Sequence, residues 1–117
     1  MDTAALLGHS ILVLEDEPLI ALEIIEALRR AGASVFGAHT VRDALPLAGR
    51  PDLSAAILDL GLGDGDGEPL FSELRLRGIP FVVYSGYPKP ASADDVPFIQ
   101  KPARTDALVD AVGKLLH

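Results

Sequence analysis

Four short runs of apolar residues along the chain each end at a polar or charged residue. The runs cover residues 11–14, 55–58, 81–84 and 98–99, and the residues that follow them are Glu15-Asp16, Asp59, Ser85 and Gln100-Lys101. Apolar runs of this length, separated by helix-patterned stretches, are typical of buried strands in a parallel sheet. Because the carboxyl ends of parallel strands lie along one edge, where ligands bind, we expect these polar side chains to converge.

The stretches between the runs have the spacing of helices. Pro18 suits the first turn of a helix whose apolar residues recur every three or four positions, and Gly32 closes it. Further helices are expected over residues 41–48, 68–77 and 106–116, and a weaker strand over residues 34–38. The alternation of strand and helix predicts a doubly wound α/β domain with five parallel strands.

Individual residues refine the expected helix boundaries. Thr40 and Thr105 are each expected to be an N-cap, because a threonine side chain can accept a hydrogen bond from the first turn of a helix. Pro46 lies inside the second helix and should make it short or kinked. The last helix has the clearest apolar stripe, which continues to Leu116.

Two segments stand outside the alternation. Residues 86–97 contain three prolines and a small, polar middle, which predicts an irregular loop with at most one turn of helix where a crossover helix is usual. Residues 1–9 are expected to be a loose leader. The domain proper is then expected over residues 10–117.

Composition narrows the possible functions. The 117 residues fit one domain, and 49% are hydrophobic, with a mean hydropathy of +0.30, which is ample for a core. There is no cysteine, so disulfides and thiolate sites are excluded. The net charge of -7 argues against nucleic-acid binding, and no apolar stretch is long enough for a membrane span or a secretory signal. A cytoplasmic location is the default.

The acids at the strand ends indicate a metal site. Carboxylates of Glu15, Asp16 and Asp59, brought together at neighbouring strand ends, would repel one another unless a cation lies among them. Oxygen ligands suit Mg²⁺ or Mn²⁺. The alternative is that each acid is simply solvated. The histidines, His39 among them, are scattered without ligand spacing and are expected to be ordinary surface residues.

The same residues favour phosphoryl chemistry. A carboxylate such as Asp59 can attack phosphorus and form an acyl phosphate. The charge that develops on the phosphoryl oxygens needs a metal and a cationic side chain, and Lys101 is placed to supply the cation. Ser85 could donate a hydrogen bond to another oxygen. Taken singly, Lys101 could be an exposed lysine and Ser85 a turn residue.

At these motifs the chain resembles a response-regulator receiver domain, the phosphoacceptor part of two-component signalling in bacteria. The match covers residues 10–116 and rests on four motifs in order. They are Ile11-Leu12-Val13-Leu14-Glu15-Asp16-Glu17-Pro18, Ala56-Ile57-Leu58-Asp59-Leu60, Val83-Tyr84-Ser85-Gly86 and Gln100-Lys101-Pro102. The resemblance implies a flavodoxin-like five-stranded sheet of order 2-1-3-4-5, with helices on both faces and the fourth helix absent or reduced to a loop.

The resemblance also assigns roles by position. Asp59 matches the phosphoacceptor, Asp16 a direct metal ligand and Glu15 an acid that acts through water. Gly61 matches the residue whose backbone carbonyl binds the metal, and Ser85 matches the hydroxyl residue that follows the phosphoryl group. Lys101 matches the family's lysine at the phosphorylation site, and the bond between Lys101 and Pro102 is implied to be cis. Phe98 matches the aromatic switch residue. The metal implied is Mg²⁺, or Mn²⁺ in its place.

The chain departs from the family pattern after Ser85. The proline-rich loop is similar to a proteobacterial subgroup with a Thr-Gly-Tyr-like stretch, whose members often work with histidine kinases of the HWE type. Ser85-Gly86-Tyr87 fits that stretch loosely, and Tyr87 could replace Phe98 as the moving aromatic residue. The alternative is that Phe98 and Tyr87 are ordinary half-buried residues.

The sequence therefore predicts a stand-alone receiver. It would accept a phosphoryl group on Asp59 from a histidine kinase or a phosphotransfer protein, and would signal to an unknown downstream protein. It would act as a phosphoacceptor rather than an enzyme, catalysing only its own phosphorylation and dephosphorylation. One alternative is a metal-dependent phosphatase, although Gly61 stands where such enzymes have a second aspartate. The other is an interaction module that works without phosphorylation.

Overall fold

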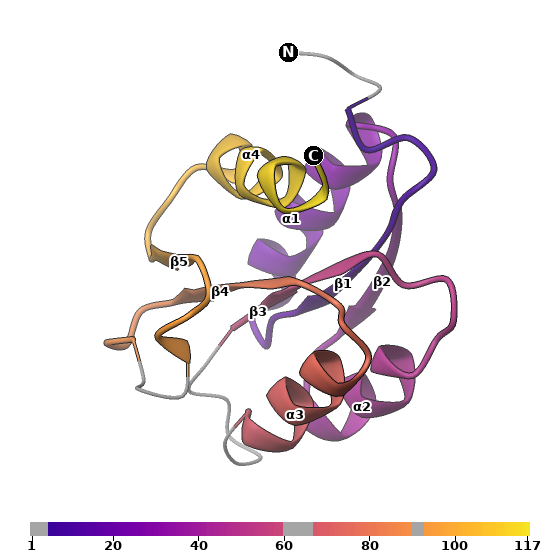
Figure 1. Ribbon diagram of the computed structural model, residues 1–117. Helices are drawn as coiled ribbons and strands as arrows, with labels where there is room; N and C mark the ends of the chain where they lie inside the picture. Colours follow the sequence, from indigo (N-terminus) through magenta and orange to yellow (C-terminus); the bar gives the residue numbers. More distant parts are fainter. Residues whose placement is uncertain (1–4, 60–66, 90–92) are drawn as a thin grey trace.

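The strands and helices follow the predicted order. The computed structural model describes residues 5–59, 67–89 and 93–117, and within them five parallel strands form a sheet of order β2-β1-β3-β4-β5 (Figure 1). The strands are β1 (Ser10–Leu14), β2 (Ser34–Ala38), β3 (Ala55–Leu58), β4 (Phe81–Ser85) and β5 (Phe98–Gln100). The helices are α1 (Pro18–Arg30), α2 (Val41–Ala48), α3 (Glu68–Leu76) and α4 (Thr105–Leu116). The flavodoxin-like α/β fold is confirmed.

Helices cover both faces of the sheet. The α1 and α4 helices lie on one face, and α2 and α3 on the other (Figure 1). In β1, Leu12 and Leu14 pack into the α2–α3 layer, whereas Ile11 and Val13 pack into the α1–α4 layer. Because successive side chains of a strand point to opposite faces, a strand covered on both sides is apolar at every position. This explains why the apolar runs show no alternation.

Most helix boundaries follow local signals. The hydroxyl oxygen of Thr40 accepts a hydrogen bond from the backbone N–H of Asp43 at 3.1 Å, so Thr40 is the N-cap of α2, as predicted. Pro46 lies inside this helix, which has eight residues. The prediction for Thr105 is wrong by one position. Arg104 has the extended backbone of a cap, with φ -74° and ψ 149°, and Thr105 is already helical.

The described part of the N-terminal segment, residues 5–9, is packed on the domain, so the expectation of a loose leader is corrected. Leu6 is fully buried in the α1–α4 layer, and its N–H donates to the carbonyl of Ala31 at 2.8 Å. Gly32 has φ +102°, and a Cβ there would lie 3.0 Å from the backbone nitrogen of Leu7. Only glycine allows this approach. A single buried leucine leaves no periodic signal in the sequence, which is why its packing was missed.

The connection between β4 and β5 contains no α-helix in its described residues, 86–89 and 93–97. Ala93 is instead fully buried in the α2–α3 layer, and Asp95 forms an ion pair with Arg75 of α3 at 2.7 Å. This agrees with the irregular loop that the prolines predict. None of the helices in the described residues has the length and apolarity needed to cross a membrane.

Candidate phosphoacceptor and metal site

Three carboxylates meet at the carboxyl ends of β1 and β3, as predicted. Glu15 and Asp16 directly follow β1, Asp59 directly follows β3, and the two strands are neighbours in the sheet. One oxygen of each carboxylate lies within 4.8 Å of the others. Glu15 and Asp59 are buried, with 1% and 6% of their surface exposed, whereas Asp16 is exposed. We call these residues the acid cluster.

Lys101, which follows β5, bridges the two buried acids. Its Nζ lies 2.7 Å from Oε2 of Glu15 and 3.0 Å from Oδ2 of Asp59. Its backbone N–H donates to the carbonyl of Ser85 at 2.9 Å, which extends the pairing of β4 with β5. The Lys101–Pro102 peptide bond is cis, as the resemblance implies. The sheet thus delivers one ammonium group to the two buried carboxylates of the acid cluster.

The ionisation of the cluster follows from burial and charge. Burial raises the pKa of Asp59 from 3.8 to about 6. The hydrogen bond from Lys101 opposes this rise, and the negative charges of Glu15 and Asp16 add to it. For Lys101, burial alone would lower the pKa, but hydrogen bonds to Glu15 and Asp59 overcome that effect and the pKa is raised. At neutral pH the ammonium therefore faces an excess of carboxylates, and the site favours a further cation.

Ser85 is the last residue of β4 and is fully buried. Its hydroxyl oxygen accepts a hydrogen bond from the backbone N–H of Tyr87 at 3.0 Å. The ring of Tyr87 is largely exposed, whereas Phe98 is half-buried and packs against the α2–α3 layer. Ser85 thus ends β4, Tyr87 lies two residues beyond it, and Phe98 is the first residue of β5. Their roles as switch residues stay predictions.

Gly61, the expected carbonyl ligand, lies outside the described residues. The structure also shows two contacts that the sequence analysis did not predict. The Nδ1 of His39 donates a hydrogen bond to the backbone carbonyl of Glu15 at 2.8 Å. His39 follows β2, so applying the strand-end rule to that strand would have found it. The Nζ of Lys101 lies 5.1 Å from the centroid of the Tyr84 ring, a contact hidden inside an apolar run.

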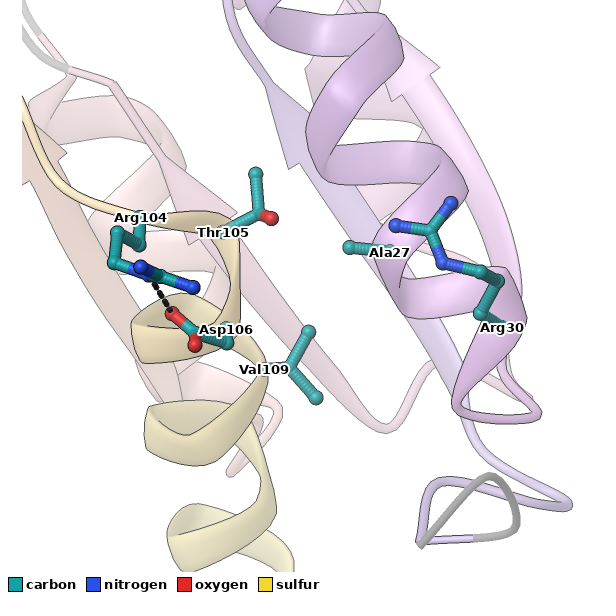
Figure 2. Close-up of a pocket in the computed structure, with 6 residues that line it drawn as sticks. All are labelled: Ala27, Arg30, Arg104, Thr105, Asp106 and Val109. Atoms are coloured by element: carbon teal, nitrogen blue, oxygen red, sulfur yellow. Dashed lines mark hydrogen bonds and ion pairs between the residues drawn. The ribbon is translucent and has the colours of Figure 1, made fainter. Parts of the chain in front are cut away.

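A hollow of about 220 Å³ lies elsewhere, between α1 and α4 (Figure 2). Ala27 and Val109 approach each other across it, with Arg30 on one helix and Arg104 before the other. The Nε of Arg104 donates to a carboxylate oxygen of Asp106 at 3.3 Å. No residue of the acid cluster lines this hollow. The candidate site is therefore the carboxyl edge of the sheet.

Comparison with known proteins gives several relatives, among them a response regulator, although no protein-family model matches the chain. The KDP operon transcriptional regulatory protein KdpE of Escherichia coli is 40% identical over 79 residues, which are 65% of this chain and 34% of KdpE. The solution structure of SdrG from Sphingomonas melonis is 35% identical, with a TM-score of 0.75, over 93% of this chain and 97% of SdrG. A response regulator from Burkholderia pseudomallei, with a phosphorylated aspartic acid, calcium ion and citrate, is 28% identical, with a TM-score of 0.76, over 89% of this chain and 66% of that one.

Fold, acid cluster and relatives agree on a class of protein. The chain belongs to the response-regulator receiver family, whose members are signalling domains. This confirms the resemblance that the four sequence motifs indicate. The chain spans about a third of the length of the curated relatives it matches.

Proposed function

We propose that this receiver is a phosphoacceptor that takes a phosphoryl group on Asp59 from a histidine kinase or a phosphotransfer protein. The observation that carries the proposal is the geometry of Asp59, a buried carboxylate held by Lys101 beside two further acids. A nucleophile, a neutralising ammonium group and oxygen ligands for a metal are all in one place. The relative from Burkholderia pseudomallei contains a phosphorylated aspartic acid and a calcium ion, which supports the same chemistry here.

The oxygen atoms of the acid cluster fit a divalent cation such as Mg²⁺ or Mn²⁺. Mg²⁺ holds oxygen ligands at about 2.1 Å, so opposite ligands lie about 4.2 Å apart, close to the 4.8 Å spread of the cluster. Asp16 and Asp59 would bind directly, with the carbonyl of Gly61 as a further ligand. Glu15 would act through water, because its oxygens already accept from Lys101 and from the N–H of Glu17 at 3.1 Å. When bound, the cation neutralises the acids and the phosphoryl oxygens.

The transfer is a displacement at phosphorus. A carboxylate oxygen of Asp59 attacks a phosphohistidine, the P–O bond forms, and the P–N bond breaks. The imidazole leaves with the electron pair and takes up a proton. During the transfer, Lys101 lies near the phosphoryl oxygens, and its positive charge stabilises the negative charge that develops there in the transition state.

The signal would pass from the site through β4 and β5. Ser85 would move toward the phosphoryl group, and this movement would act on the hydrogen bond from Tyr87 and on Phe98. The conformational equilibrium of the loop over residues 86–97 and of α4 would shift as a result. We propose that an unidentified downstream protein binds the altered surface and so responds to the signal. An HWE-type histidine kinase is the donor that the loop between β4 and β5 favours.

Mass spectrometry of the intact protein tests the proposal directly. Incubation with acetyl phosphate and Mg²⁺ should add one phosphoryl group, and Asp59→Asn should abolish the addition. Asp94→Asn, at an exposed acid outside the cluster, is the matched control and should be phosphorylated like the native protein. Labelling that survives in Asp59→Asn, or labelling that needs no divalent cation, would contradict the assignment.

A further inference from the structure

Tyr84, a buried tyrosine next to Ser85, has no part in the steps above. Only 5% of its surface is exposed, and its side chain belongs to the α1–α4 layer. The Nζ of Lys101 nevertheless lies over its ring, 5.1 Å from the centroid. A cation within about 6 Å of an aromatic face is attracted by the ring quadrupole, and more strongly when both groups are shielded from water. Tyr84 is therefore a third partner of Lys101, besides two carboxylates.

We propose that Tyr84 is a positioning residue for Lys101. Its ring holds the ammonium group at the site while the carboxylates are occupied by the metal and the phosphoryl group. The inference rests on the proposed function, because it assigns a role within the same site. It gives a role to a residue that lies within the third sequence motif but to which the resemblance assigns none.

The need for such a partner follows from competition for oxygen atoms. In the structure, Lys101 is held by Glu15 and Asp59, and Asp59 belongs to the acid cluster that would bind the cation. A divalent cation neutralises these carboxylates and so weakens their attraction for the ammonium group. The ring of Tyr84 is not a metal ligand, and its attraction for a cation does not depend on the charge of the acids. It can therefore keep Lys101 in place when the other two contacts weaken.

The backbone supports the same arrangement. Ser85 follows Tyr84 in β4, and its carbonyl accepts the hydrogen bond from the N–H of Lys101 at 2.9 Å. Tyr84 itself is paired with Ile99 in β5. Both ends of the contact are thus fixed on two paired strands. The flexible side chain of Lys101 is the part that needs a further constraint, since its long stem carries considerable rotamer entropy.

Three substitutions separate positioning from packing. Tyr84→Phe keeps the ring, Tyr84→Leu removes it, and Phe81→Leu removes another buried aromatic residue of β4 from the opposite layer. We expect Tyr84→Leu to lower both the rate of phosphorylation by acetyl phosphate and the affinity for beryllofluoride by roughly threefold to tenfold. Tyr84→Phe and Phe81→Leu should stay within about twofold of the native protein. Affinity for Mg²⁺ alone should be unchanged in all three, because none of them alters a carboxylate of the acid cluster.

A spectroscopic measurement on the unphosphorylated protein adds an independent readout. The ring current of Tyr84 should shift the ε-methylene protons of Lys101 upfield. This shift should persist in Tyr84→Phe and disappear in Tyr84→Leu, or in Tyr84→Met if the leucine variant does not fold. A purely structural role for Tyr84 predicts parallel losses of Mg²⁺ and beryllofluoride affinity, which would overturn the inference.

The outcomes distinguish this inference from the proposed function. If the native protein is phosphorylated and folded Tyr84→Leu behaves like it, the inference alone is overturned. If Tyr84→Phe loses as much as Tyr84→Leu, the hydroxyl group carries the effect and the inference is again overturned. If the native protein accepts no phosphoryl group, the proposed function fails, and the positioning role that rests on it fails with it.

Discussion

Asp59→Asn should stabilise the metal-free protein at neutral pH. The substitution replaces a buried carboxylate by a neutral amide of nearly the same shape. In the folded protein, burial raises the pKa of Asp59 from 3.8 to about 6, against the hydrogen bond from Lys101 and with the help of Glu15 and Asp16. The ionised form is therefore less favourable in the folded state than in the unfolded chain, and the amide escapes this penalty.

The size of the effect follows from linkage between proton binding and folding. Between its unfolded and folded pKa values, Asp59 binds more protons in the folded state, so its contribution to stability is present at low pH and is lost as pH rises through about 6. A shift of about two pKa units corresponds to about 3 kcal/mol above pH 7. By the same relation, the ionisation of Asp59 lowers the free energy of unfolding by only about 1 kcal/mol at pH 4.5. For a domain of this size, 3 kcal/mol raises the melting temperature by roughly 12 °C.

Urea unfolding of the two proteins in a chelating buffer measures the difference. The free energy of unfolding of Asp59→Asn should exceed that of the native protein by up to about 3 kcal/mol at pH 7.5, and by about 1 kcal/mol at pH 4.5. Asp94→Asn, at an exposed acid, should change stability by less than about 0.5 kcal/mol at either pH. Saturating Mg²⁺ should then stabilise the native protein by about 2.7 kcal/mol at 100 times its dissociation constant and should have little effect on Asp59→Asn.

Two results would refute this reasoning. A less stable Asp59→Asn at pH 7.5 would mean that the attraction of Lys101 outweighs the burial and crowding of Asp59. If the difference in free energy of unfolding between the two proteins does not change with pH, the amide acts through packing or hydrogen bonding rather than through charge.

Two further substitutions test other parts of the structure. Leu6→Ala should lower the free energy of unfolding by about 2 to 4 kcal/mol in urea titrations, because it empties a buried position. The adjacent Leu7→Ala, at a residue 71% exposed, should change the free energy of unfolding little. Equal effects of the two substitutions would contradict the packing of this segment. Lys101→Met should raise Mg²⁺ affinity about tenfold in calorimetric titrations, because it removes the ammonium group that competes for Glu15 and Asp59. An unchanged or weaker affinity would argue against that competition.

The sequence predicts that these side chains converge because the rule it rests on is geometric, while their roles stay predictions. Parallel strands bring their carboxyl ends to one edge, so residues directly after β1, β3 and β5 must meet if the sheet forms. Glu15, Asp59 and Lys101 are far apart in the chain, yet each follows an apolar run that is easy to locate. Burial and distances confirm their convergence. The hydrogen bond of His39 and the contact of Lys101 with the Tyr84 ring needed the structure.

Other features left no readable signal. In β4 every residue from Phe81 to Tyr84 is apolar, so the sequence does not say which side chains face which helix layer. The contact of Tyr84 with Lys101 was invisible for this reason. Leu6 is buried by tertiary packing alone, outside any strand or helix. The cap of α4 was misplaced because a threonine beside the true boundary carries the stronger local preference.

Residues 93–97, the described part of the connection that precedes β5, are held by separate contacts and not by the cooperative hydrogen bonds of an α-helix. A helix is stabilised by a ladder of repeated backbone hydrogen bonds and tends to form or melt as a unit. Here Val96 donates one backbone hydrogen bond to Ala93, whose side chain is buried, and Pro97 accepts one from Val83. The exposed Asp95 is held by Arg75 through an ion pair of a kind that adds little stability. Such a segment can rearrange one contact at a time. Evolution can therefore alter the shape that this surface offers to a binding partner without disturbing the chemistry at Asp59.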